Sequence, residues 1–129
     1  MELEDLRILL TQNLGMEVTV HEKYIMSYWK IDKKIQKQII FFPDAETRIL
    51  YISMRFDEKN QDADFLAKLL KENLKLSFVK FCMDKDGNLM ALAEVPEASI
   101  SDECLRTSLY AVFKAAERFY VLLSTKARS

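Results

Sequence analysis

The sequence predicts an α+β fold in which helices cover one face of an antiparallel sheet. Three observations support this prediction. Polar and apolar side chains alternate through residues 16–56, with short turns between the runs, as in antiparallel strands. Residues 77–95 form a closing hairpin around Asp84–Asn88, and residues 102–124 carry apolar side chains at helical spacing. The expected order is helix, three or four strands, helix, two strands and a long helix, in a single domain over residues 1–129.

A first helix is expected over residues 2–14, which end at Gly15, where a left-handed C-cap favours glycine. Its apolar stripe, at spacings of three and four, contains Leu3, Leu6, Leu10 and Leu14. The helix therefore presents one face to a core.

Strands follow over residues 16–22, 24–31, 35–42 and 47–56, with turns at 32–34 and 43–46. The pattern leaves open whether 16–22 and 24–31 are two strands or one bent strand. The apolar run Ile39–Phe42 is expected to be buried on both faces. In the last of these strands the residues expected to face the core are Leu50, Ile52, Met54 and Phe56.

A second helix is expected over residues 63–73, with Asp62 as its N-cap. Its buried face is expected to hold Phe65, Leu66, Leu69 and Leu70. In the hairpin, Asp84 is expected to accept bonds from backbone amides and Gly87 to adopt a positive φ. Its core side is expected to hold Val79, Phe81 and Met83 on one strand and Leu89, Ala91, Ala93 and Val95 on the other. Ser101 is expected to cap the long helix.

Composition narrows the possible partners. The 19 basic and 20 acidic side chains give a net charge of -1, which lacks the basic excess that phosphate binding needs. No apolar run approaches the roughly 18 residues of a membrane span, and the acidic start lacks a signal-peptide pattern. Cys82 and Cys104 do not form a disulfide framework. We therefore expect a cytoplasmic protein with free thiols, without a membrane partner and without nucleic acid as its main partner.

No catalytic, cofactor-binding or metal-binding set is visible. Gly15 and Gly87 are the only glycines, so a glycine-rich phosphate loop cannot be built. Asp84, with Asp86 and Asn88, lacks the spacing of a calcium loop and is explained by turn chemistry. The only histidine, His21, lies beside charged residues and is expected to face solvent. We expect no enzyme activity, no cofactor and no metal.

One stretch resembles a known family. Residues 73–96, NLKLSFVKFCMDKDGNLMALAEVP, combine a helix end with Asn, two apolar strands around an Asp-rich turn, and a final Pro; a capped helix containing AAERFYVLL follows. This layout resembles the type III secretion chaperone-like superfamily, which includes the YbjN-type domains. The resemblance implies a homodimeric, non-enzymatic binding fold. Secretion chaperones of this type are typically strongly acidic, whereas this chain is nearly neutral, which favours general partner binding over effector export.

The leading hypothesis is a homodimeric, chaperone-like or regulatory module that binds a protein or peptide. Aromatic residues are favoured at interfaces, so Tyr28, Trp29 and Tyr51 are candidate contacts. Small residues on the last helix, Ala111 and Ala115, are candidates for close approach of another element, either inside the chain or in a dimer.

Two alternatives remain. A small enzyme could use the scattered carboxylates Glu22, Asp57 and Asp62, if they converge in a pocket. A weak nucleic-acid binder could use the turn that carries Lys30, Lys33, Lys34 and Lys37.

Overall fold

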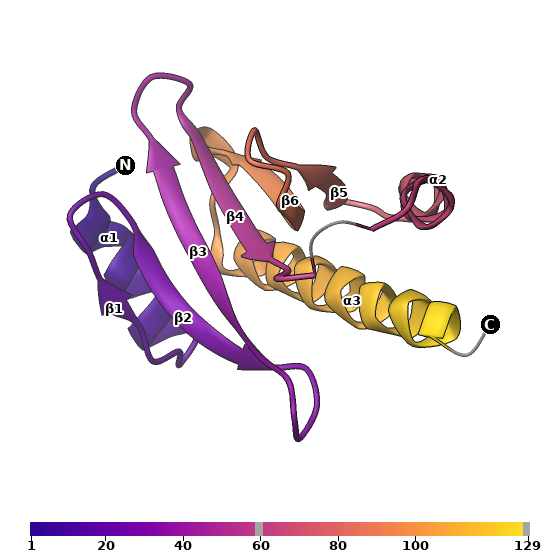
Figure 1. Cartoon of the computed structure of the whole chain (residues 1–129). Coiled ribbons are helices and arrows are strands. Elements are labelled where there is room, and N and C mark those ends of the chain that lie inside the picture. Colours follow the sequence, from indigo (N-terminus) through magenta and orange to yellow (C-terminus); the bar gives the residue numbers. More distant parts are fainter. Residues whose placement is uncertain (59–60, 128–129) are drawn as a thin grey trace.

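A computed structural model describes residues 1–58 and 61–127 (Figure 1). The chain begins with α1 (Leu3–Ile8) and the π-helical turn η1 (Leu9–Asn13). The strands β1 (Thr19–Val20), β2 (Ile25–Lys30), β3 (Gln36–Asp44) and β4 (Ile49–Arg55) follow. After α2 (Ala63–Glu72) come β5 (Lys80–Met83), β6 (Leu89–Pro96), the short 3₁₀ turn η2 (Glu97–Ser99) and α3 (Asp102–Ala127).

The six strands form one sheet in the order β1-β2-β3-β4-β6-β5, and every neighbouring pair is antiparallel. Leu6 and Leu10 from the first helical segment and Phe119 from α3 join the same buried cluster as the inner face of the sheet. α2 lies at the β5 edge, against α3 (Figure 1). The predicted α+β class, with helices on one face, is confirmed.

Phe119 of α3 is the centre of the core at the end of the molecule that carries α2 and β5. Its ring stacks on Phe56 with centroids 4.0 Å apart and meets Phe65 of α2 edge-on at 5.8 Å. Phe81 of β5 lies 6.4 Å away. Phe119 therefore joins α2, α3 and the sheet.

Local chemistry at the helix ends matches the sequence. Gly15 has a φ of +70°, as a left-handed C-cap requires. The Asp62 carboxylate accepts a hydrogen bond from the Phe65 amide at 2.8 Å, and the Ser101 hydroxyl accepts one from the Cys104 amide at 3.0 Å. The predicted N-caps of α2 and α3 are therefore confirmed.

The β5–β6 turn also forms as predicted. Asp84 Oδ1 accepts bonds from the amides of Asp86 and Asn88, at 3.0 and 2.9 Å. Gly87 has a φ of +83°. The Asp84 side chain therefore organises the backbone of this turn, which is the role that the sequence predicts for it.

Two predictions on the first strands need correction. Residues 16–31 contain two strands, but β1 is only two residues long, and the His21 amide donates to the Tyr24 carbonyl at 2.8 Å across the tight turn. β3 continues through Pro43 and Asp44, so the turn predicted at 43–46 forms at 45–48 instead. Proline is tolerated there because β2 ends its pairing with β3 at Phe41, which leaves that side of β3 without a strand to receive an N–H.

Four large side chains assigned to the core or to a strand lie on the surface. Phe42 is 37% exposed, because strict alternation continues to the end of β3 instead of burying both faces. Leu70 and Met83 are 62% and 52% exposed. Phe78 precedes β5 instead of lying in it, with a φ of +69° and 70% of its surface exposed.

A buried charge that the sequence pattern missed anchors α2. Glu72 faces inward, and Arg118 of α3 donates to its carboxylate at 2.9 Å. This hydrogen bond lowers the pKa of Glu72 below its usual value of 4.5. The ionised pair therefore holds α2 to α3.

Replacing Glu72 with Gln is expected to lower the free energy of unfolding by about 1 kcal/mol at neutral pH, because a charge-assisted bond to a half-exposed arginine is lost. A lowered carboxyl pKa stabilises the fold above the unfolded-state pKa, and this contribution is lost as pH falls through the folded-state pKa. Urea unfolding at about pH 7 and pH 3 should show the difference shrinking in acid. Glu117→Gln, which removes a surface pair with Lys114, is the control. An equal loss for both variants at neutral pH would contradict the anchoring role.

Candidate functional site: an open edge of the sheet

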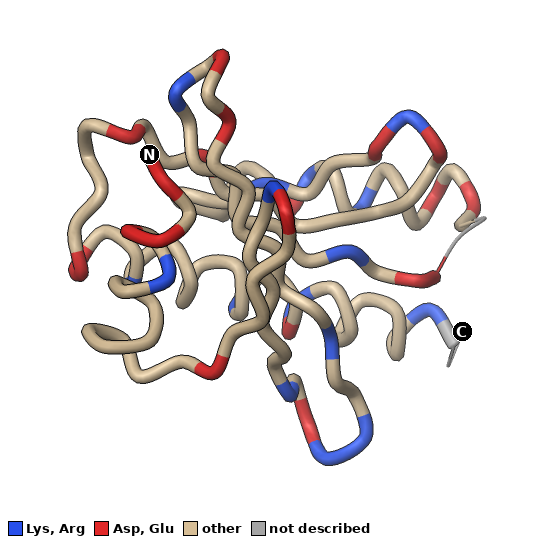
Figure 2. Tube along the Cα trace, turned by 90° about the vertical axis from the view of Figure 1, so that its left-hand side faces the viewer, with Lys and Arg blue, Asp and Glu red and all other residues tan. Residues whose placement is uncertain are grey.

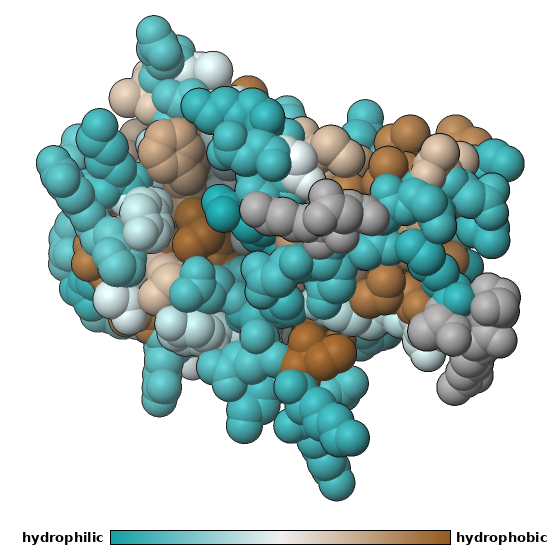
Figure 3. Space-filling model, in the orientation of Figure 1, coloured by the Kyte–Doolittle hydropathy of each residue, from teal (hydrophilic) through white to brown (hydrophobic). Residues whose placement is uncertain are grey.

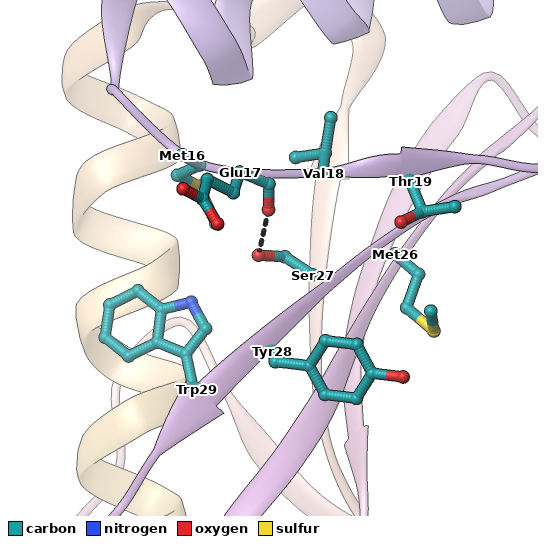
Figure 4. Close-up of a pocket in the computed structure, with 8 residues that line it drawn as sticks. All are labelled: Met16, Glu17, Val18, Thr19, Met26, Ser27, Tyr28 and Trp29. Carbon is teal, nitrogen blue, oxygen red and sulfur yellow. Dashed lines mark hydrogen bonds between the residues drawn. The ribbon is translucent and has the colours of Figure 1, made fainter.

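The β1 edge of the sheet is only partly covered. β1 pairs with β2 through two residue pairs, Val20 with Ile25 and Thr19 with Met26. Upstream of Thr19 the chain turns away from strand pairing, and the Ser27 hydroxyl donates to the Glu17 carbonyl at 2.7 Å (Figure 4). Beyond Met26, β2 has no strand beside it on this side within the described chain.

The backbone groups on this open side follow from the antiparallel pattern. The Tyr24 carbonyl accepts from His21 on the β1 side, and alternate residues of a strand point their N–H and C=O to the same side. The N–H and C=O groups of Tyr28 and Lys30 therefore face the open edge. They offer a second strand a ready set of hydrogen-bond partners.

A hollow of about 410 Å³ runs along this edge. It is lined by Met16, Glu17, Val18, Thr19, Met26, Ser27, Tyr28 and Trp29 (Figure 4). The Trp29 ring points toward α3, and Tyr28 points to the opposite side of β2. A chain lying along the edge would therefore meet an aromatic side chain on each face.

A second hollow, of about 260 Å³, continues the first on the helix side. It is lined by Leu14, Met16, Trp29, Arg106, Leu109, Tyr110 and Phe113. The two share Met16 and Trp29, and the Trp29 ring lies 5.1 Å from that of Phe113. We call the two hollows together the β2-edge groove.

The opposite edge of the sheet is covered at Phe81. Asn73, at the end of α2, accepts a hydrogen bond from the Phe81 amide at 2.7 Å and donates one to the Phe81 carbonyl at 3.1 Å. The Asn73 side-chain amide thus makes the two hydrogen bonds that a further strand beside β5 would make with Phe81. Proteins usually block free edges because they recruit other strands. The contrast makes the open β2 edge the stronger candidate for a binding site.

The groove brings together two of the predicted contact residues, Trp29 and Tyr28. Tyr51 lies elsewhere, on the helix-free face of the sheet, where its ring is 6.5 Å from that of Phe42. Ala111 is half-buried on α3. Ala115 has no exposed surface and belongs to the core of this chain, so it offers nothing to a partner in this conformation.

Comparison with known protein families gives a match over most of the chain. The model of the family YbjN, described as a putative bacterial sensory transduction regulator, matches residues 5–123. The chain belongs to the YbjN family. Comparison with curated proteins gives no match.

Solved structures share the fold of this YbjN-family chain. A chain of the ExsC–ExsE complex has a TM-score of 0.66 at 19% identity and covers 92% of this chain and 94% of its own. A chain of the heterodimeric ExoU–SpcU complex from the type III secretion system of Pseudomonas aeruginosa gives 0.63 at 14%, covering 88% and 93%. A chain of the HopA1–SchA chaperone–effector complex gives 0.60 at 18%, again covering 88% and 93%. The predicted resemblance is confirmed, and at these identities it shows the fold alone.

The carboxylates of the enzyme alternative do not converge in this YbjN-family chain. Glu22 lies in the β1–β2 turn, whereas Asp57 follows β4 at the other end of the sheet. Asp57 binds Lys37 at 3.1 Å with 82% of its side chain exposed, and Asp62 is occupied as the cap of α2. Within residues 1–58 and 61–127 no three His, Cys, Asp or Glu side chains are arranged to hold a metal ion.

The remaining predictions concern charged and aromatic residues. Figure 2 shows the basic loop between β2 and β3 extending from the sheet. Lys37 is not part of its exposed surface, because its ammonium group binds Asp57 and lies 5.8 Å from the centre of the Tyr120 ring. His21 is half-buried and stacks on Tyr24 at 4.6 Å, so the prediction of a solvent-facing histidine is wrong.

Among the described residues no helix has the length and apolar character needed to cross a membrane.

Proposed function

We propose that this YbjN-family chain is a non-enzymatic protein-binding module that holds an extended segment of a partner protein in the β2-edge groove. It works as a homodimer, in the cytoplasm. The observation that carries the proposal is the unpaired edge of β2 beside Trp29. Structural neighbours described as complexes of two proteins, one of them a chaperone with its effector, support this kind of role.

The groove is suited to strand addition. In this mode, backbone hydrogen bonds supply affinity and pockets for alternate side chains supply specificity. A segment beside β2 would bond to the backbone of Tyr28 and Lys30. Its alternate side chains would enter the apolar hollow beside Trp29 and Phe113 or lie over Tyr28. The partner segment is therefore expected to carry apolar residues at alternate positions.

Trp29 is the only tryptophan in the chain, so its fluorescence reports directly on the groove. The probe is a set of synthetic ten-residue peptides with alternating apolar and polar residues, and matched peptides in which a central residue is Pro. We expect the alternating peptides to shift Trp29 emission and the Pro peptides to bind about tenfold more weakly, because they cannot complete the backbone pairing.

A proline in β2 tests the pairing from the protein side. Tyr28→Pro removes an N–H that faces the open edge and leaves the pairing of β2 with β3 intact. Tyr28→Ala is the matched control, because it removes the ring and keeps the N–H. We expect Tyr28→Pro to bind peptide about tenfold more weakly than Tyr28→Ala. Equal affinities would rule out strand addition at this edge.

A further inference from the structure

The helix-free face of the sheet carries a further hollow, on the other side of β2 from the Trp29 ring. Its volume is about 670 Å³, which is larger than either hollow of the β2-edge groove. Figure 4 shows Tyr28 pointing toward this face and away from α3. We call this hollow the sheet-face site; its lining includes Tyr28, Gln38, Ile40, Ser53, Arg55 and Met90.

The strand register sets the width of the sheet-face site. Tyr28 of β2 pairs with Gln38 of β3, and Arg55 of β4 pairs with Met90 of β6. Continuing the β3–β4 register by one residue places Gln38 beside Arg55. Tyr28 and Arg55 are thus two strand spacings apart, which is about 10 Å. An aromatic side chain and a cation therefore face each other across a distance that suits a small ring with a short charged arm.

The floor of the site is apolar and open to solvent. Ile40 and Met90 are half-buried, and no helix packs on this face within the described chain. Figure 3 shows apolar side chains open to view over β2 and β3, between hydrophilic neighbours. Ser53 comes from β4, the strand between β3 and β6. A planar ring on this floor would remove apolar surface from water, and the Ser53 hydroxyl could bond to a polar substituent.

The charges around the hollow favour an anion. Arg55 forms no ion pair within residues 1–58 and 61–127. The Asp57 carboxylate, which also lines the hollow, is bound to Lys37 at 3.1 Å. Hydrogen bonds from Asn88 and, more weakly, the charge of Arg55 lower the pKa of Asp84, whose side chain is held in the β5–β6 turn. The Arg55 guanidinium therefore keeps its fork of donors for a carboxylate from outside the chain.

The other half of the same face limits the size of this anion. Glu94 is exposed and pairs with Tyr51, and Asp44 ends β3 two residues beyond Phe42. A single-stranded nucleic acid stacked on the aromatic residues of this face would bring its phosphates close to these carboxylates. A small anion held at Arg55 would avoid them.

We propose that the sheet-face site binds a small aromatic carboxylate. Its ring lies on Ile40 and Met90 beside Tyr28, and its carboxylate accepts hydrogen bonds from Arg55. The Gln38 amide donates to the Tyr28 hydroxyl at 3.3 Å, which leaves the hydroxyl proton for the ligand. This binding activity is independent of the proposed function, because neither the Trp29 ring nor the free edge of β2 takes part.

Phenylacetate is the probe, titrated into the ¹⁵N-labelled full chain and followed by nuclear magnetic resonance. With about ten non-hydrogen atoms it is expected to bind with a Kd on the order of 1 mM, and to shift the amide signals of Ile40 and Ser53. Phenylacetamide has the same shape without the charge and should bind at least about tenfold more weakly. Trp29 emission should stay unchanged, which separates this site from the β2-edge groove.

Arg55→Gln tests the cation directly. We expect it to bind phenylacetate about as weakly as the wild type binds phenylacetamide. Lys80→Gln is the matched control, because it removes an exposed cation of β5 outside the lining and should leave the Kd unchanged. Circular dichroism verifies that both variants are folded. Equal binding of acid and amide, an unchanged Kd in Arg55→Gln, or no shift at about 10 mM probe overturns the proposal. An oligothymidylate that binds more tightly than phenylacetate in an Arg55-dependent way overturns it too.

Discussion

Replacing Phe119 with Ala is expected to lower the free energy of unfolding by about 4 kcal/mol, the largest effect of any variant considered. Phe119 has no exposed surface, and its ring contacts aromatic side chains of three other segments, including Phe56 at 4.0 Å. Removing it leaves a cavity between helices and sheet that rigid neighbours cannot fill. Because native domains are stable by about 5–15 kcal/mol, this loss is a large part of the whole. Urea unfolding followed by circular dichroism measures it.

Phe42→Ala removes the same side chain from the helix-free face, where Phe42 is 37% exposed. We expect it to cost about 1 kcal/mol, since little apolar area returns to water. A similar loss for the two variants would show that Phe119 is not the central contact. Phe119 also packs on Phe65, so its replacement should loosen the packing of α2 on the sheet.

Features set by local chemistry could be predicted from the sequence. The caps at Asp62 and Ser101 and the turn around Gly87 each depend on a few neighbouring residues, and each formed as expected. The core face of β4 followed from simple alternation. The end of β3 did not, because whether Pro43 ends a strand depends on which sides of β3 have neighbours.

Burial of apolar residues could be predicted only in part. Leu69 and Leu70 are neighbouring leucines on the same helix, yet Leu69 is 3% exposed and Leu70 is 62% exposed. A helical pattern identifies apolar positions but does not say whether the same chain or a second copy covers them. The exposure of Leu70 and Leu74 is thus the feature that a single sequence could not supply.

The candidate site shows the same limit. Tyr28 and Trp29 could be selected as aromatic residues on one strand. Met16, from a loop, and Phe113, from α3, join them through tertiary packing, which a single sequence does not reveal. The small size of Ala115 is equally compatible with a core or an interface, and the fold places it in the core.

Asn73→Ala is expected to cost about 3 kcal/mol, because the N–H and C=O of Phe81 both lose their partner in a partly buried position. Its second effect should be greater association at high concentration, since the change opens the β5 edge to other strands. Urea unfolding measures the first effect, and light scattering against concentration measures the second. Lys71→Ala, on the exposed flank of the same helix, should change stability by less than about 0.5 kcal/mol.

Asn73→Asp separates the two bonds of this side chain. A carboxylate can still accept from the Phe81 amide but cannot donate to its carbonyl, so we expect about half of the loss seen with Ala. If Asn73→Ala unfolds at the same urea concentration as the wild type and does not associate, the β5 edge is not held closed by this residue. The contrast between a closed β5 edge and an open β2 edge would then no longer single out the groove. A stable, monodisperse Asn73→Ala would therefore weaken the case for strand addition at Tyr28 as well.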